Sequence, residues 1–119
     1  MTVDAGAAGW LAAARHEPSP NCDARPAGEV PWLLVVHAIS LPPGEFGSGD
    51  ILDLFANRLA VDRHPYFAGI CGLRVSAHFL IRRDGELIQF VSCDERAWHA
   101  GISSWRGRER CNDFSIGVE

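Results

Sequence analysis

Apolar residues occur along the chain in short runs separated by polar stretches rich in glycine and proline. The run 32–39 (Trp-Leu-Leu-Val-Val-His-Ala-Ile) is short and rich in valine, which predicts a buried strand. Segment 75–92 predicts two strands joined at Asp84-Gly85, a dipeptide suited to the positive φ angles of a tight hairpin turn. Residues 114–119 alternate large apolar residues with small or polar ones and predict a last strand.

Helical spacing is found in two places. Residues 10–16 (Trp-Leu-Ala-Ala-Ala-Arg-His) suggest a short helix, and Asp50 is placed to cap a second helix over 51–60, whose apolar residues recur three and four apart. Between the strand at 32–39 and this helix, residues 40–49 have the composition of a loop. The order α, β, α, β, β, loop, β predicts an α/β fold with a mixed central sheet flanked by helices. Without a repeat or a dividing linker, residues 1–119 form one expected domain.

The composition and net charge of the chain argue against several classes of function. The chain has 11 Lys and Arg against 15 Asp and Glu and a net charge of -4, which argues against a nucleic-acid binder. It has no export signal at its start and no apolar stretch near the roughly 20 residues of a membrane span, so we expect a cytoplasmic protein with no membrane partner. The four cysteines are widely spaced and are expected to be reduced thiols.

Candidate chemistry lies where two predicted strands end. Alternation places His37 near the carboxyl end of the first strand, and it places Glu119 at the end of the last strand on the face of Ser115 and Gly117. Because ligands gather at the carboxyl ends of parallel strands, these two residues can meet, as a metal ligand or base beside a carboxylate. The alternatives are a hydrogen-bonded core histidine and a solvated carboxylate. One His and one Glu are also too few for a catalytic zinc ion, which takes three protein ligands.

The strand pattern does not determine the roles of two further histidines. His78 lies in the strand Ser-Ala-His-Phe-Leu-Ile, and His99 lies in Ala-Trp-His-Ala-Gly. Alternation in the hairpin does not aim either of them at His37. We therefore expect structural or substrate-contacting roles for both.

Several long motifs carry a resemblance to a known family. They are LLVVHAISLPPGEFG, HPYF, LRVSAHFLIRRDGELIQFV and RAWHAGISSWRGRERCNDFSIGVE, in this order from about Trp10 to the last residue. Together they resemble the zinc-dependent N-acetylmuramoyl-L-alanine amidases, in particular the cytoplasmic enzymes of peptidoglycan recycling. The resemblance implies the fold shared with peptidoglycan recognition proteins, a Zn²⁺ cofactor, and hydrolysis of the amide between anhydro-N-acetylmuramic acid and L-alanine. It further implies muropeptide substrates and a monomer in the complete enzyme.

The resemblance also implies roles for particular residues. His37 matches the first zinc ligand, and Glu119 matches the catalytic glutamate, which accepts a proton from the attacking water. Trp98 and, more weakly, Tyr66 match positions that line the substrate groove. Arg74 and Arg110 match arginines near the peptide and its carboxylates. Taken alone, Trp98 could equally be a core indole, and each arginine would be taken for a solvated surface charge.

Two departures from the family pattern limit these expectations. Ala38 stands where the family usually has Asn beside the zinc-binding His, which removes one amide from the site. The family also supplies a second His, a Lys and an Asp after the glutamate, and this chain ends at Glu119. We therefore expect a domain without its C-terminal part, an incomplete zinc site and an inactive isolated chain. A muropeptide-binding module without zinc and a nonfunctional remnant are the alternatives.

Overall fold

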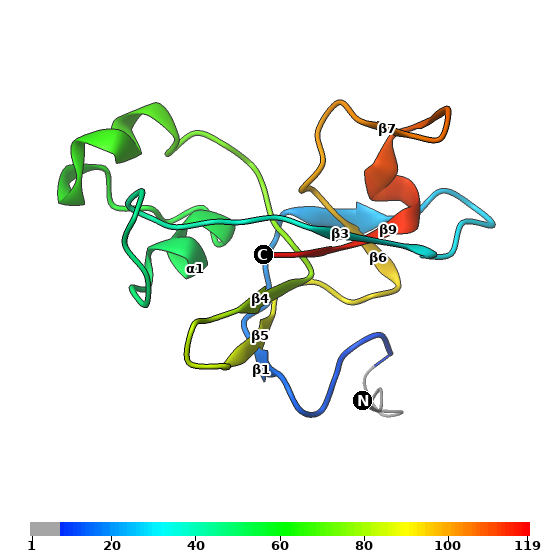
Figure 1. The fold of residues 1–119 in the computed structure, drawn as a ribbon, viewed down its shortest axis with the longest axis horizontal. Coiled ribbons are helices and arrows are strands. Elements are labelled where there is room, and N and C mark those ends of the chain that lie inside the picture. The colour runs from blue at the N-terminus through cyan, green and yellow to red at the C-terminus, as the bar shows by residue number, and fades with distance from the viewer. Residues whose placement is uncertain (1–7) are drawn as a thin grey trace.

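A computed structural model describes residues 8–119. These residues form short strands and short helices arranged around a central sheet of five strands (Figure 1). The strands are β1 (Arg15–His16), β2 (Cys22–Ala24), β3 (Leu33–Val36), β4 (Phe79–Ile81), β5 (Leu87–Gln89), β6 (Glu95–Ala97), β7 (Ser104–Trp105), β8 (Arg108–Glu109) and β9 (Ser115–Val118). The helical elements are α1 (Asp50–Phe55) and three 3₁₀ turns, η1 (Val61–Arg63), η2 (Pro65–Gly69) and η3 (Cys111–Phe114). The predicted mixed sheet is thus confirmed.

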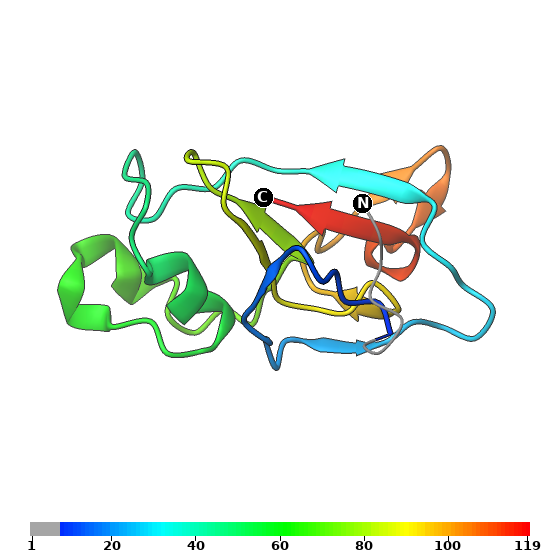
Figure 2. The same cartoon turned by 90° about the horizontal axis from the view of Figure 1, so that it is seen from below.

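The central sheet has the order β1-β5-β4-β9-β3. Strand β9 lies between β3 and β4 and is parallel to both, whereas β4 and β5 form an antiparallel hairpin. Figure 2 shows β3 and β9 side by side and pointing the same way. The carboxyl ends of β3, β4 and β9 therefore meet at one edge of the sheet.

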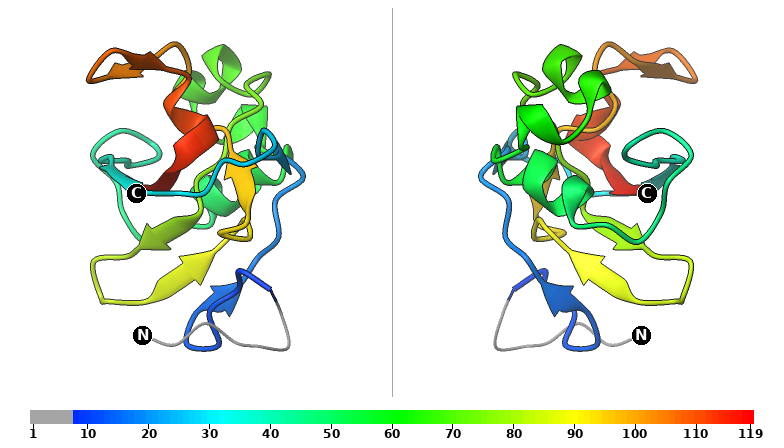
Figure 3. Two further views of the ribbon diagram at one scale, coloured as in Figure 1. Left: turned by 90° about the vertical axis from the view of Figure 1, so that its right-hand side faces the viewer. Right: turned by 90° about the vertical axis from the view of Figure 1, so that its left-hand side faces the viewer.

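The hairpin formed by β4 and β5 turns where the sequence predicts. Gly85 has φ +91°, a conformation that glycine adopts without steric cost, and the turn is closed by the Gly85 N–H, which donates to the Arg82 carbonyl at 2.9 Å. In the register, Leu80 is opposite Ile88, and both are buried. Figure 3 shows this hairpin with β1 along its outer side. The other small ladders are β2 with β6 and β7 with β8.

The predicted helix over 10–16 is wrong. Its last two residues form strand β1, which pairs in parallel with β5, and the Leu11 N–H donates to the Gln89 side chain at 2.8 Å. Three alanines favour a helix, but an isolated helix of two turns is marginal because nucleation is costly. Hydrogen bonds to the edge of the sheet satisfy the same backbone groups.

The second predicted helix is present but shorter. It ends at Phe55 rather than at residue 60, and Asn57 follows with φ +61°, a left-handed conformation that Asn tolerates better than most residues. The N-cap is Gly49, so Asp50 is the first helical residue and not the cap. The buried Asp50 carboxylate instead accepts from the Ser48 hydroxyl at 2.9 Å and pairs with Arg63 at 2.9 Å.

The hydrophobic core lies between the sheet and the helical segment. It contains Phe55 and Phe67 from the helical side and Leu80, Ile88 and Phe90 from the hairpin. The rings of Phe55 and Phe90 meet edge to face with centroids 4.9 Å apart. None of the helices within residues 8–119 has the length and apolarity that a membrane crossing requires.

The opposite face of the sheet is apolar and largely uncovered in the structure. Leu34 and Val36 of β3 are 62% and 70% exposed, and Ile81 at the end of β4 is 55% exposed. The prediction of a buried strand over 32–39 is therefore wrong in its burial and its length, because β3 covers only Leu33–Val36 and lies at the edge of the sheet. In β9, the small residues Ser115 and Gly117 are the buried ones, whereas Ile116 and Val118 are only partly buried. The alternation in residues 114–119 therefore marks two different surfaces, and the site described below lies on the side of the small residues.

Candidate active site

His37 and Glu119 follow paired residues of neighbouring parallel strands. Val36 of β3 is in register with Val118 of β9, and the His37 N–H donates to the Val118 carbonyl at 2.8 Å. The Glu119 N–H donates to the Phe79 carbonyl at 2.9 Å, and the Glu119 backbone oxygen accepts from the Ile81 N–H at 3.0 Å. The sheet thus fixes the backbone of both residues at its carboxyl edge, as the strand pattern predicts.

The environment of Glu119 shifts the pKa of its carboxyl group. Burial raises the pKa of the Glu119 carboxyl, and a positive charge on His37 would lower it in part. A carboxylate with a raised pKa is a stronger base than an exposed one, which suits proton transfer near neutral pH.

The side chain of His99 contacts that of His37. Its Nδ1 lies 3.0 Å from His37 Nε2, and its Nε2 lies 3.1 Å from the Ser115 hydroxyl oxygen. The imidazoles meet edge to face with centroids 5.2 Å apart. Burial, assisted by the charges of His37, His78 and Arg25, lowers the pKa of His99 to about 4, so its ring is neutral at pH 7. Sequence reasoning did not aim His99 at His37.

Gly117 makes room for this contact. A Cβ atom at Gly117 would lie 2.6 Å from both Cγ and Cδ2 of His99, closer than real Cβ contacts come. Small residues at 115 and 117, on the strand face that carries Glu119, were the sequence signal that a ring packs there.

His78 is fully buried behind β9 and serves the fold. Its Nδ1 accepts from the Gly117 N–H at 3.1 Å, so its Nε2 carries the proton and donates to the Glu95 carbonyl at 2.9 Å. Since Nε2 is a donor, its 3.4 Å approach to the Arg25 guanidinium is a contact between two donors, not a hydrogen bond. Burial chiefly lowers the pKa of His78 to about 4. The structural role expected for His78 agrees with these contacts.

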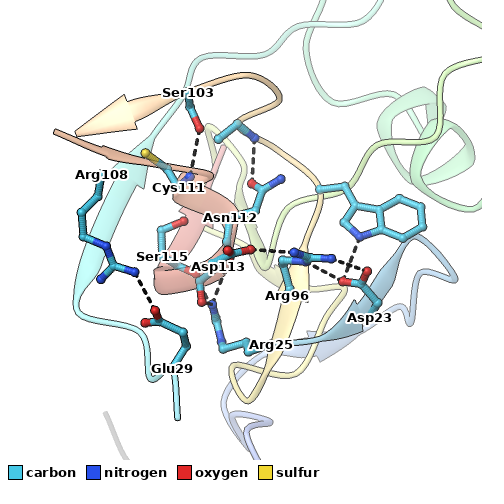
Figure 4. Close-up of polar contacts among 12 residues, drawn as sticks. Asp23, Arg25, Glu29, Arg96, Ser103, Arg108, Cys111, Asn112, Asp113 and Ser115 are labelled. Atoms are coloured by element: carbon cyan, nitrogen blue, oxygen red, sulfur yellow. Dashed lines mark hydrogen bonds and ion pairs between the residues drawn. The ribbon is translucent and has the colours of Figure 1, made fainter. Parts of the chain in front are cut away.

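A polar network holds the 3₁₀ turn η3 from which β9 begins (Figure 4). Arg25 donates to the carbonyls of Asn112 and Asp113 at 3.1 Å and to that of Ser115 at 2.9 Å. Arg96 bridges Asp113 and Asp23, each at 2.6 Å. These contacts fix the turn before the strand that carries Glu119.

Trp98 is tied to the same network. Its indole N–H donates to Asp23 Oδ1 at 3.2 Å, and its ring is half-buried. Hydrogen bonds from Arg96 chiefly lower the pKa of Asp23, so this carboxylate is ionised and accepts from both donors. The indole is therefore held in one orientation, and its outer part stays accessible.

The other three predicted substrate residues lie at exposed positions. Tyr66 is 48% exposed in η2, Arg74 is exposed before β4, and Arg110 is exposed just before η3. Arg110 lines a hollow of about 480 Å³ with the loop at Gly101 and Ile102. Among residues 8–119, no hydrogen bond or ion pair joins Tyr66 or Arg74 to His37 or Glu119. Of the six predicted residues, His37 and Glu119 are held next to each other by the ends of β3 and β9, whereas Tyr66, Arg74 and Arg110 lie at exposed positions.

A second hollow, of about 200 Å³, opens directly beside Glu119. Ala38, Phe46 and Arg83 also line it, and the Arg83 guanidinium lies 3.6 Å above the Phe46 ring. A group bound there would meet a carboxylate, an apolar floor and a positive charge.

Comparison with known proteins places this arrangement in a family. The sequence model of the N-acetylmuramoyl-L-alanine amidase family, Amidase_2, matches residues 27–119. The chain belongs to the N-acetylmuramoyl-L-alanine amidase family. The match includes His37, His99, Glu119 and the turn η3, whereas Asp23 and Arg25 of the network around η3 precede it.

Two curated members of the family are similar over most of the chain. The 1,6-anhydro-N-acetylmuramyl-L-alanine amidase AmpD of Citrobacter freundii is 67% identical over 111 residues, which are 93% of this chain and 59% of that protein. The protein of the same name from Escherichia coli K12 is 63% identical over 93% of this chain and 61% of its own length. The chain therefore spans about 60% of the length of these relatives.

A solved structure supports the amidase fold. A crystal structure of a selenomethionine AmpD derivative superposes with a TM-score of 0.94 at 64% identity, covering 99% of this chain and 64% of the other. This structural similarity confirms the mixed α/β fold that the sequence predicts.

The described residues fit one ligand position of a zinc site and do not complete it. Imidazole nitrogen is a common zinc ligand, and His37 has one ring nitrogen, Nδ1, outside its contact with His99. Within residues 8–119, no three His, Cys, Asp or Glu side chains are grouped so that they could hold a metal ion.

Proposed function

We propose that residues 1–119 belong to an amidase domain that hydrolyses the amide between anhydro-N-acetylmuramic acid and L-alanine in muropeptides. The observation that carries the proposal is the placement of His37 and Glu119 at the joint carboxyl edge of β3 and β9, with a hollow beside Glu119 that is open to a substrate. Two relatives named for this reaction, at 67% and 63% identity, supply the substrate class. A cytoplasmic location in peptidoglycan recycling is part of the same proposal.

Glu119 acts as the general base in this proposal. Its carboxylate accepts a proton from the attacking water and passes it to the amide nitrogen as the C–N bond breaks. His37 holds one position of the zinc site, and zinc, when bound, supplies Lewis-acid polarisation of the amide carbonyl. The hollow beside Glu119 takes the reacting group, with Arg82 and Arg83 as the positive charges on its wall.

We propose that Trp98, Arg110, Arg74 and Tyr66 contact the substrate. The fixed, half-buried indole of Trp98 offers one face to a sugar or peptide. Arg110, on the hollow near Ile102, offers a guanidinium to a peptide carboxylate. Arg74 and Tyr66 are supported by the family resemblance alone.

The test is a chimera that joins residues 1–119 to the remaining segment of the Citrobacter freundii relative. We expect the chimera to release peptide from anhydromuramyl-L-alanyl-peptide, followed by chromatography, and we expect Glu119→Gln to reduce kcat by at least about a hundredfold. Restoring the amide with Ala38→Asn measures the effect of the departure from the family pattern. A folded chimera that is inactive both with Ala38 and with the Ala38→Asn substitution would refute the amidase proposal.

A binding module without metal is the second candidate, because the described residues contain no complete group of metal ligands. It predicts that the 119-residue chain binds the same muropeptide equally well with and without a chelator. Isothermal titration of the chain in both conditions separates it from the amidase.

A further inference from the structure

We propose that His99 is a positioning residue. It holds the His37 ring by its Nε2 atom, so that His37 presents Nδ1 to a bound metal ion. The inference deepens the proposed function, on which the role of His37 as a ligand rests. It is carried by the chain of contacts from His37 through His99 to Ser115.

Within residues 8–119, the hydrogen-bond contact of the His37 ring is made by Nε2, which leaves Nδ1 for a ligand. His37 Nε2 is 3.0 Å from His99 Nδ1, and the backbone N–H of His37 is bound to the Val118 carbonyl at 2.8 Å. A neutral imidazole has one donor nitrogen and one acceptor nitrogen. For Nδ1 to offer a lone pair, Nε2 must carry the proton and donate to His99 Nδ1. His99 then donates from Nε2 to the Ser115 oxygen, 3.1 Å away, so that each donor meets an acceptor.

His99 is itself held firmly enough to orient another ring. The backbone N–H groups of His99 and Ala100 both donate to Asn112 Oδ1, at 3.2 and 2.9 Å. Figure 4 shows Asn112 in the turn η3 and Ser115 at the start of β9, next to the Arg25 and Arg96 network. On the other side of the ring, Gly117 offers a flat backbone surface. The His99 ring is thus fixed by its own backbone, by Ser115 and by β9.

This arrangement corresponds to what metal-binding histidines commonly require. The second ring nitrogen of such a histidine usually donates to a protein acceptor, which fixes its tautomer and orientation. Here the acceptor is another imidazole rather than a carboxylate or a carbonyl.

The experiment reads the His37 ring directly in the 119-residue chain. Histidine ring nitrogens are labelled with ¹⁵N, and two-bond nitrogen–proton spectra at pH 7.5 show which nitrogen of each ring carries the proton. We expect His37 to carry it on Nε2, with a proton that is protected from exchange. In His99→Leu, which keeps apolar bulk but has no acceptor, this proton should exchange about tenfold faster. In His99→Asn, whose amide oxygen stands near the place of Nδ1, protection should be retained.

His16 is the internal control, because its contact is with the Leu11 carbonyl and its signals should not change in any variant. A His37 proton on Nδ1, or equal exchange in the original chain and in His99→Leu, would overturn the inference. None of these readings depends on hydrolysis, so an inactive chimera would contradict the proposed function without affecting this result.

Discussion

Substitution of Gly117 by alanine tests whether the His99 ring packs on β9. The new Cβ would stand 2.6 Å from Cγ and Cδ2 of His99 and 2.9 Å from its Nδ1. The backbone cannot retreat easily, since the Gly117 carbonyl accepts from the His78 N–H at 3.0 Å and the Gly117 N–H donates to His78. The imidazole must therefore move and lose its contact with His37.

The magnitude follows from two opposing effects. Overpacking of a well-ordered site costs about 1–3 kcal/mol. Replacing glycine within a strand by alanine recovers about 0.5–1 kcal/mol of chain entropy. We therefore expect Gly117→Ala to lower the free energy of unfolding by about 1–2 kcal/mol. In a His99→Ala background the clash is gone, so the same substitution should be neutral or stabilising, a coupling of about 2 kcal/mol.

The assay is urea unfolding of the four proteins of this double-mutant cycle, followed by tryptophan fluorescence and circular dichroism. Gly72→Ala is the matched control, because a Cβ there meets no atom within 4 Å and its φ is not in the left-handed region. Equal effects of Gly117→Ala with and without His99 would refute the packing of this ring on β9, and with it the positioning of His37.

The remaining predictions concern the buried polar groups and the two faces of the sheet. The pKa of His78 is about 4 in the fold against about 6.5 in the unfolded chain, so the unfolded state binds the proton first, and unfolding free energy should fall as pH drops from 6.5 to 4. His78→Gln should make urea midpoints less dependent on pH across this window, and an unchanged slope would contradict the assignment. Asn21→Ala should cost about 2 kcal/mol in urea unfolding, since the Asn21 amide serves the Val75 carbonyl and exchanges two hydrogen bonds with Asn57; a cost below about 0.5 kcal/mol would contradict this. Val36→Thr on the open sheet face should change thermal stability little, whereas Leu80→Thr in the core should lower it by at least about 2 kcal/mol, and equal losses would contradict the assignment of the faces.

The parts of the fold that the sequence predicts are those in which local preference and tertiary pairing agree. The Asp84-Gly85 turn and the valine-rich strand before His37 have strong local signals, and both are present. The strand is shorter than predicted and is not buried, because it lies at the edge of the sheet with one face open. Residues 10–16 have a helical composition but supply an edge strand, because the sheet offers backbone partners that a short helix cannot match. That partner, β5, lies more than 70 residues further along the chain, so no local pattern reveals it.

In the candidate site, too, some residues could be placed from the sequence pattern and others could not. The ends of two parallel strands can be inferred from alternation, which is why His37 and Glu119 were expected at one edge of the sheet. The contact of His99 with His37 depends on an irregular loop after β6, whose course is set by Asn112 and not by a period of two. Loops of this kind have no periodicity from which side-chain direction can be read.

The alternation of β9 has a meaning that hydrophobicity alone does not convey. Its larger residues, Ile116 and Val118, lie on the open face, whereas the buried face carries Ser115 and Gly117. A strand with small residues on its buried side leaves space for another ring, and here that space is filled by His99. Glu119 continues the same side of the strand, so the proposed base lies on the same side of β9 as the residues that make room for His99. A substitution that enlarges position 115 or 117 should therefore disturb the ring of His37 while the backbone of Glu119 stays bound to β4.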